Sequence, residues 1–163
     1  MDTIQRKYFL LFIILAFTSV NVSCQGLNDA NVLLTEQTLP ASAIEDQELL
    51  AYGIDNSETL EQKWNEFEFS ASIPDVNWST SSLIIIGMME PGCEIIVTEV
   101  QIQETELLFK TELDTGLFSD DCSMEANPVS FVIEMEKETV HNAEKVQFHG
   151  KEADILNGTD PSS

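Results

Sequence analysis

Residues 82–97 read SLIIIGMMEPGCEIIV, and this stretch joins an apolar run, a turn and the start of a second strand. The run at residues 83–89 has the length of a strand and no polar interruption, which predicts a central strand buried on both faces. Gly87 within the run predicts a bulge or a close approach to the backbone. A Pro-Gly turn follows, and residues 93–103 then alternate between apolar and polar side chains, as a half-buried strand does.

Further segments of strand character lie on both sides of this stretch. Residues 105–113 alternate in the same way and predict an antiparallel hairpin with residues 93–103. Other strands are predicted at residues 31–39, 49–54 and 129–137, with a short one at 146–149, whereas residues 115–128 have the composition of a loop.

One segment has helical periodicity instead. Leu60, Trp64 and Phe67 fall at positions i, i+4 and i+7, which predicts a helix over residues 57–67 that packs Trp64 against a sheet. The preceding Asp-Asn-Ser offers side-chain oxygens of the kind that cap a helix N-terminus. We therefore predict a mainly β fold, an antiparallel sandwich or open barrel of about six strands with one short helix.

The N-terminal segment has the layout of a secretory signal. Two basic residues, Arg6 and Lys7, precede the apolar run YFLLFIILAF at residues 8–17, and small polar residues follow up to Cys24. The run is short for a membrane span, although a transmembrane anchor is the alternative. We predict that the chain is exported to a bacterial cell envelope, with a periplasmic or secreted location as the alternative.

Cys24 ends the sequence Asn-Val-Ser-Cys, which partly matches a bacterial lipobox. The Ser-Cys ending resembles that of the lipoproteins of Bacteroidota-type bacteria, and it predicts that Cys24 is lipidated and anchors the chain to a membrane. The alternative is an ordinary signal that is cleaved near Cys24. The predicted organisation is a signal at residues 1–24, a tether and first strand at 25–48, a β-rich domain at 49–150 and a flexible tail at 151–163.

The charge balance is strongly acidic. The chain has 29 Asp and Glu against 7 Lys and Arg, a formal net charge of −22. Such a surface repels nucleic acid and anionic lipid headgroups, so we predict no nucleic-acid partner. The main interpretation is a solvated acidic face without a specific partner, and the alternative is a surface that favours basic partners or divalent cations.

Three cysteines are present, and Cys93 and Cys122 remain when Cys24 is assigned to an anchor. In an exported chain they predict a structural disulfide between neighbouring β-elements. A metal pair or a redox dithiol is the alternative, but the two residues lack the C-x-x-C spacing that those sites prefer.

The order of these segments resembles a known family, on the residues 57–137. Trp64 on a helix is followed by Ile-Pro-Asp-Val-Asn-Trp at residues 73–78, then by SLIIIG, PGCEIIVTEV, TELLFKTEL and NPVSFVIEMEK. This order is similar to that of the PrcB-like C-terminal domain, found in a subunit that stabilises a surface protease complex of spirochaetes and in many exported bacterial proteins. The turn at residues 90–93 keeps the family's glycine but has Cys93 where the family has tyrosine. The resemblance implies an accessory or interaction domain without enzymatic activity.

Motifs of catalytic or metal chemistry are weak. Asp114-Thr115-Gly116 matches the Asp-Thr-Gly of aspartic proteases, but there is no second copy and a turn is the plainer interpretation. The acidic side chains of this loop, Asp114, Asp120 and Asp121, form a candidate cation or ligand site without the spacing of a calcium loop. His141 and His149, with Glu144, are either metal ligands or solvent-exposed side chains.

We therefore predict a lipid-anchored envelope protein with no catalytic residues, no cofactor and no metal centre. Its predicted role is an accessory or interaction protein that stabilises another envelope protein, such as a protease or a surface complex. The alternative function is an acidic envelope domain that binds a ligand or calcium.

Overall fold

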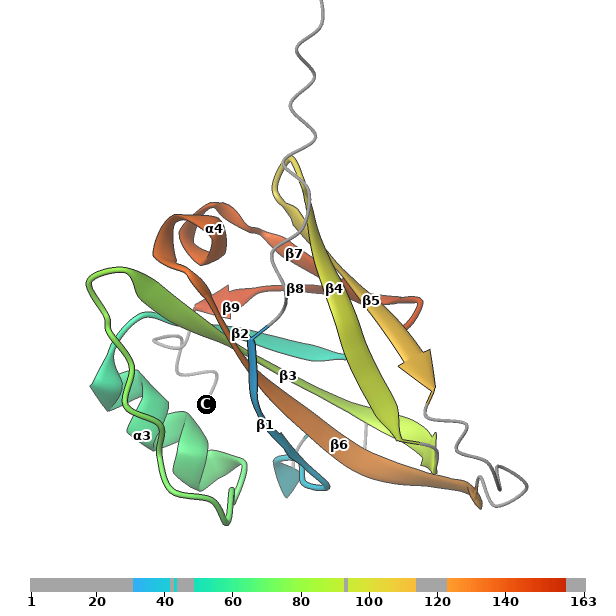
Figure 1. The fold of residues 1–163 in the computed structure, drawn as a ribbon. Helices are drawn as coiled ribbons and strands as arrows, with labels where there is room; N and C mark the ends of the chain where they lie inside the picture. The colour runs from blue at the N-terminus through green and yellow to red at the C-terminus, as the bar shows by residue number, and fades with distance from the viewer. Residues whose placement is uncertain (1–30, 42, 44–48, 93, 114–122, 158–163) are drawn as a thin grey trace, which may run out of the picture.

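The structure, a computed structural model, describes residues 31–41, 43, 49–92, 94–113 and 123–157. Two β-sheets account for most of these residues, with one ten-residue helix and one six-residue helix (Figure 1). The predicted mainly β class is confirmed. The described residues contain nine strands, so the predicted count of about six is low because the C-terminal strands are short.

The larger sheet has five strands in the order β1-β6-β3-β2-β9. Its strands are β1 (Asn31–Glu36), β2 (Leu50–Ile54), β3 (Ser81–Gly92), β6 (Ser123–Glu136) and β9 (Leu156–Asn157). All of its pairings are antiparallel except that of β2 with β9. β1 belongs to this sheet, so the β domain begins before the predicted boundary at residue 49.

The smaller sheet has four strands in the order β4-β5-β7-β8. Its strands are β4 (Ile95–Gln103), β5 (Glu106–Leu113), β7 (Lys145–Phe148) and β8 (Lys151–Asp154). β4 and β5 form the predicted antiparallel hairpin, whereas β5 and β7 run parallel. The sandwich is therefore mixed and not wholly antiparallel.

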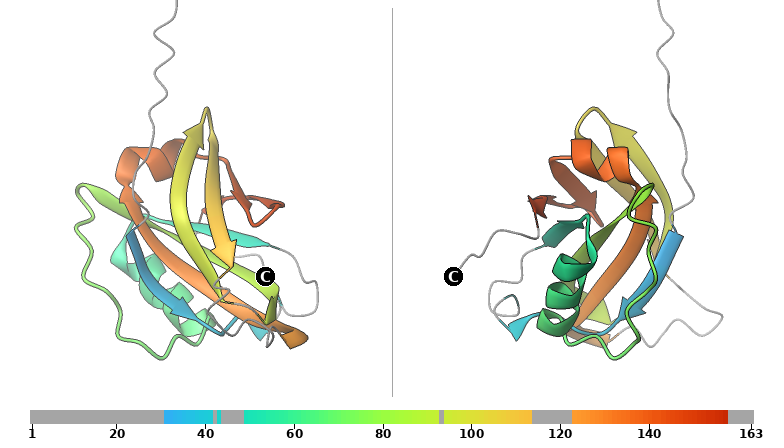
Figure 2. Two further views of the ribbon diagram at one scale, coloured as in Figure 1. Left: turned by 45° about the vertical axis from the view of Figure 1, so that its right-hand side comes forward. Right: turned by 90° about the vertical axis from the view of Figure 1, so that its left-hand side faces the viewer.

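Three layers result from this arrangement. Helix α3 (Ser57–Glu66) covers one face of the five-stranded sheet, and the four-stranded sheet covers the other (Figure 2). Two hydrophobic clusters fill the two interfaces, one on each side of the larger sheet.

Strand β3 contributes to both clusters, which explains its unbroken apolar sequence. Ile84 and Ile86 face the four-stranded sheet, whereas Leu83 and Ile85 face helix α3. All four side chains are fully buried. Because successive side chains of a strand point to opposite faces, only a continuous apolar run satisfies both interfaces. The prediction of a central strand buried on both faces is confirmed.

Helix α3 forms as its periodicity predicts. Leu60 and Trp64 are buried in the cluster against the sheet, together with Phe67 at the helix C-cap. At the other end, Asn56 is the N-cap, and its Oδ1 accepts a hydrogen bond of 2.9 Å from the Thr59 backbone N–H. The Trp64 indole N–H donates to the Ala71 carbonyl at 2.8 Å, so its one polar group is satisfied inside the core.

Gly87 allows two side chains to approach β3 closely. A Cβ at this position would lie 2.5 Å from Leu39 Cδ2 and 3.1 Å from Phe67 Cε1. The strand pairing is regular here, with Gly87 opposite Leu50 and Ser130. The prediction of a close approach is confirmed, and the alternative of a bulge at Gly87 is wrong.

A carboxylate fixes the segment that follows α3. Glu36, at the end of β1, accepts hydrogen bonds from the Ser70 N–H at 2.9 Å, the Ser70 hydroxyl at 3.0 Å and the Ala71 N–H at 3.0 Å. The Ser70 backbone bond is the main cause of a lowered pKa at Glu36. The carboxylate therefore ties the connection between α3 and β3 to the edge of the larger sheet.

The structure corrects three local predictions. The predicted flexible tail is wrong for residues 151–157, because β8 and β9 add to the two sheets there. Residues 123–128 belong to strand β6 and not to the predicted loop. Residues 137–142 form the helix α4 (Lys137–Asn142), although residue 137 was predicted to end a strand. In each case pairing or packing with distant segments outweighs weak local signals.

Candidate functional site

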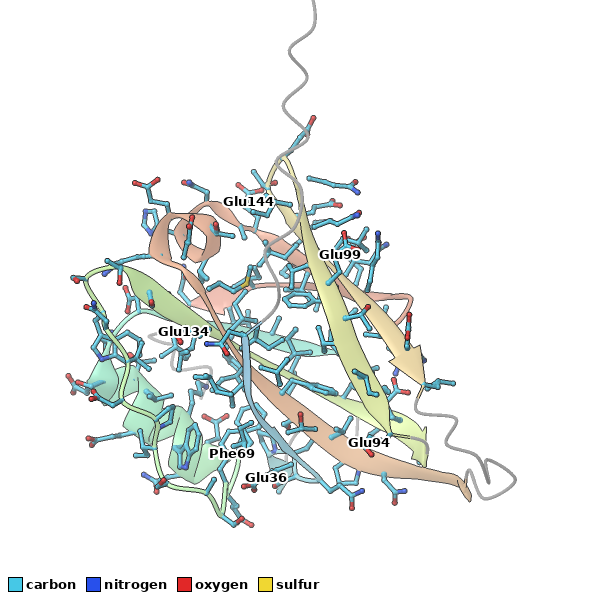
Figure 3. All side chains as sticks on the ribbon, in the orientation of Figure 1. Glu36, Phe69, Glu94, Glu99, Glu134 and Glu144 are labelled. Carbon is cyan, nitrogen blue, oxygen red and sulfur yellow. The ribbon has the colours of Figure 1, made fainter. Side chains whose placement is uncertain are left out.

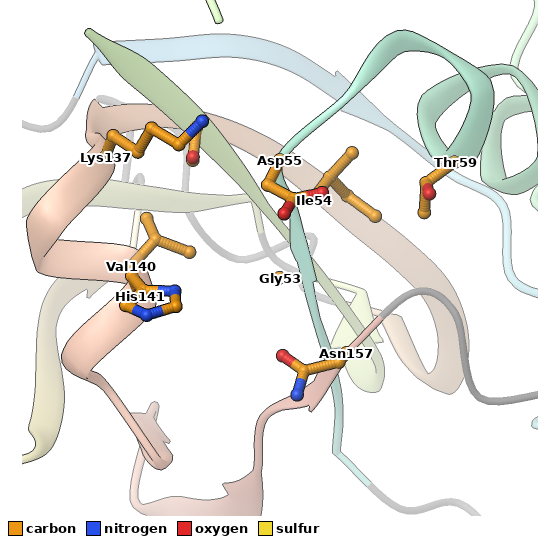
Figure 4. A pocket seen from close by; sticks show the side chains of 9 residues that line it. Gly53, Ile54, Asp55, Thr59, Lys137, Val140, His141 and Asn157 are labelled. Carbon is orange, nitrogen blue, oxygen red and sulfur yellow. The ribbon is translucent and has the colours of Figure 1, made fainter. Parts of the chain in front are cut away.

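A pocket of about 230 Å³ lies where β2 ends, beside α4 and β9. Its walls come from four parts of the chain that are far apart in sequence. Figure 4 shows Lys137, Val140 and His141 of α4 on one side, Asp55 and Thr59 on the other, and Asn157 of β9 below them. The remaining lining residues are Gly53, Ile54 and Ser82.

Lys137 gives the pocket a positive charge. Its ammonium group donates to the Trp78 carbonyl at 3.0 Å. No carboxylate of the described residues forms an ion pair with it, whereas Lys63, Lys110 and Lys145 each pair with a glutamate. His141 lies one helical turn beyond Lys137 and lines the same pocket.

Asp55 gives the pocket a negative charge on the opposite side. Its Oδ1 accepts a hydrogen bond of 2.6 Å from the Asn56 side-chain amide. Val140 adds an apolar group to the lining, whereas Ile54 is fully buried and packs into the cluster on the helix α3 side of the larger sheet. The pocket therefore combines two opposite charges with a small apolar surface.

A second group of polar side chains lies at the other end of the molecule. His149, in the turn between β7 and β8, has its Nδ1 at 2.9 Å from the Thr111 hydroxyl and its Nε2 at 3.7 Å from a Glu90 carboxylate oxygen. Glu90 is only 4% exposed. Because Glu90 is on the larger sheet and the other two are on or beside the smaller one, the group bridges the two sheets.

The environment of Glu90 alters its acidity. Burial raises the pKa of its carboxyl above the ordinary value, and the charges of His149 and Lys151 act in the opposite direction. A histidine between a hydroxyl and a buried carboxylate has the composition of a catalytic triad. The three side chains link strands and a turn of the two sheets, so the geometry supports a polar bridge between the sheets.

A third feature is the acidic surface of the β4–β5 hairpin. Glu94, Glu104, Glu106 and Glu112 are exposed on or beside these two strands. The hairpin's one lysine, Lys110, pairs with Glu99 at 3.0 Å. Figure 3 labels Glu94, just before β4, and Glu99 on β4, which is one of the two edge strands of the smaller sheet. Ile96, also on β4, is 44% exposed among these charges.

The predicted site residues are only partly described by the structure. Cys24, Cys93 and Cys122, and the acidic loop residues Asp114, Asp120 and Asp121, lie outside the described residues. His141 and His149 are described and lie on different elements, in the pocket and beside Glu90. Within the described part of the chain, no group of three or more His, Cys, Asp or Glu side chains is arranged to hold a metal ion.

The pocket is not among the sites that the sequence predicts. The local pattern predicts a helix cap around Asp55 and the end of a strand at Lys137. A local signal was present, because Lys137 and His141 have the i, i+4 spacing that places two side chains on one helix face. The contribution of β9 depends on a pairing between residues about a hundred positions apart, which local patterns do not reveal.

Among the described residues, no helix has the length and apolar character needed to cross a membrane. No family model, curated protein or solved structure matches this chain. The resemblance to the PrcB-like domain therefore stays a prediction.

Proposed function

We propose that this chain is a lipid-anchored cell-envelope accessory protein that binds and stabilises another protein. The predicted export signal and the partial lipobox match support the location, and the PrcB-like segment order supports an accessory role. The single observation on which the binding role rests is β4, an edge strand of nine residues that pairs with β5 on one side.

An edge strand offers backbone groups to an incoming strand from another protein. β4 contains an irregularity between Val97 and Glu99, and beyond it residues 99–103 pair in unbroken register with β5. This five-residue segment is long enough for a partner strand of ordinary length to pair with it. The exposed Ile96 offers an apolar contact next to the same edge.

The charge of the hairpin indicates the chemistry of the partner. Four exposed glutamates surround β4 and β5, and the hairpin's lysine is already paired. A partner segment with lysine or arginine beside its strand complements these charges and associates faster at low ionic strength. We therefore expect a basic protein segment as the contact.

The test is affinity capture from solubilised envelope of the source cell, with the mature chain immobilised. Three forms are compared: wild type, Ile96→Ser and Ile73→Ser. Ile96 and Ile73 are equally exposed, at 44% each, but Ile73 lies on the segment after α3, away from β4. We expect one protein, identified by mass spectrometry, to be retained by wild type and Ile73→Ser and lost with Ile96→Ser.

A second pair of variants tests the charge. Glu106→Lys reverses an exposed charge on the hairpin, and Glu61→Lys reverses an exposed charge on α3. Only Glu106→Lys should weaken capture. Equal capture by all variants, or no retained protein in repeated experiments, would contradict binding through this edge.

The anchor is tested separately with radiolabelled palmitate. Wild type should incorporate the label, and Cys24→Ala should not. Equal labelling of the two forms would rule out lipidation at Cys24 without affecting the binding proposal.

A further inference from the structure

From the pocket formed by β2, α4 and β9, we infer that this protein also binds a small aliphatic α-amino acid in its zwitterionic form. The proposed ligand places its carboxylate at Lys137 and His141, its ammonium group at Asp55, and its side chain against Val140. This site is distant in sequence from the β4 edge and does not depend on the proposed protein partner.

The positive group of the pocket is available to an anion. After residue 24 the chain has five lysines and no arginine. Three of the five pair with glutamates, and Lys151 donates to the Met89 carbonyl at 3.4 Å. Lys137 lines a cavity with only a neutral carbonyl as its described partner. A charged partner binds an ammonium group more strongly than a neutral carbonyl does.

The two charges of the pocket remain apart. Asp55 and Lys137 line the same cavity but form no ion pair with each other, although both are described. A ligand with both a carboxylate and an ammonium group is able to bridge them. Thr59 and Ser82, both buried, add hydroxyl groups to the same lining.

Overall charge favours a zwitterion over a simple anion. A chain with a net charge of −22 repels a free anion before it reaches the pocket, whereas a ligand of zero net charge meets no such barrier.

Size limits the ligand further. The cavity holds about 230 Å³, less than the roughly 300–1,000 Å³ of pockets for drug-sized molecules. Val140 offers an apolar contact that suits a short aliphatic side chain.

The test uses the full mature chain, with L-valine as the probe. Binding is measured by NMR titration and by calorimetry. Isovalerate has the same carbon skeleton without the ammonium group, and isobutylamine lacks the carboxylate. We expect L-valine to bind with a dissociation constant below about 1 mM. The amide signals of Gly53, Val140 and Asn157 should shift, and both analogues should bind at least about tenfold more weakly.

Variants assign the two charges. Lys137→Gln and Asp55→Asn should each weaken L-valine binding by about tenfold or more, while Lys110→Gln, which breaks a distant surface ion pair, should leave it unchanged. Thermal unfolding of each variant checks that it is folded, and the wild-type titration needs no variant at all. The inference is overturned if wild type shows no shifts at these amides, if isovalerate binds as tightly as L-valine, or if folded Lys137→Gln binds normally.

Discussion

At the scale of single residues, Gly87 is notable because its neighbours leave no room for a side chain. Leu39 and Phe67 occupy the space that any side chain at this position would need. We predict that Gly87→Ala lowers the free energy of unfolding by about 1–3 kcal/mol, the usual cost of overpacking a core. Urea unfolding at equilibrium measures the change.

A double-mutant cycle identifies the cause of that loss. Leu39→Ala alone removes a buried side chain and should cost about 2–5 kcal/mol. In the presence of Leu39→Ala, however, Gly87→Ala should cost much less, because the nearest atom has gone. Strictly additive losses would show that the steric explanation is wrong.

Glu90 predicts a dependence of stability on pH. Because burial raises its pKa, the folded state holds the proton more tightly than the unfolded state, whose value is near 4.5. The contribution of Glu90 to the free energy of unfolding is therefore largest below pH 4.5 and falls as pH rises through the folded-state pKa. As pH rises from below 4.5 through the folded-state pKa, the free energy of unfolding of Glu90→Gln should therefore fall less than that of wild type.

The measurement is urea unfolding at a series of pH values from acid to neutral. Glu94→Gln, at an exposed carboxyl near the start of β4, is the matched control and should follow the wild-type curve. Parallel curves for wild type and Glu90→Gln would contradict a proton held by burial.

At the scale of elements, helix α3 depends on its cap. Asn56 satisfies the Thr59 N–H at 2.9 Å, so Asn56→Ala should lower the free energy of unfolding by about 1 kcal/mol. Asn65 is the matched control, because it is an exposed asparagine inside the same helix, where alanine is the better helix former. Asn65→Ala should leave stability unchanged or raise it slightly, and an equal loss in both variants would contradict specific capping.

The ladder between β3 and β6 bears on the predicted disulfide. Gly92 lies opposite Ser123 in this ladder. Cys93 follows Gly92 in the sequence and Cys122 precedes Ser123, so the two cysteines are the sequence neighbours of this pair.

We predict that the denatured, unreduced mature chain shows no free thiol at Cys93 or Cys122. Reduction should lower the free energy of unfolding by roughly 3–4 kcal/mol, since the bond closes a loop of about thirty residues. Cys93→Ser with Cys122→Ser is the control and should not respond to reductant. Free thiols at both positions in the unreduced chain would refute the pairing.

Local patterns predicted the elements in which buried side chains recur at regular intervals along the sequence. The apolar run of β3, the alternation of β4 and β5 and the helical spacing of Leu60 and Trp64 each reflect contact with a continuous buried surface. The β8 strand was missed because its sequence, KEAD, is polar, and pairing with β7 across the His149-Gly150 turn holds it in place. Both turn residues have positive φ, which for His149 no sequence pattern indicated.

The candidate sites were harder to predict than the fold for a related reason. Asp55, Lys137 and Asn157 share one pocket only because α4 and β9 pack beside β2. Glu90 and His149 meet only when the two sheets are stacked. Taken singly, each of these residues resembles an ordinary surface or strand residue. Only the folded chain brings them together.

At the scale of the whole molecule, the net charge of −22 opposes the compact state. We predict that the thermal midpoint rises as sodium chloride increases from low to physiological concentration, where the screening length is about 8 Å. Calcium and magnesium chloride at equal ionic strength should give equal midpoints. A larger rise with calcium alone would instead support the predicted cation loop at Asp114, Asp120 and Asp121.

The C-terminal strands complete both sheets, with β7 and β8 in the smaller one and β9 in the larger one. β9 pairs with β2 and β7 pairs with β5, and in each pair the partner strand is synthesised much earlier. A chain emerging from a ribosome therefore cannot complete both sheets until residue 157 has left the exit tunnel. In an exported protein of the kind proposed, this late completion favours an unfolded nascent chain, the form that a translocation channel can pass.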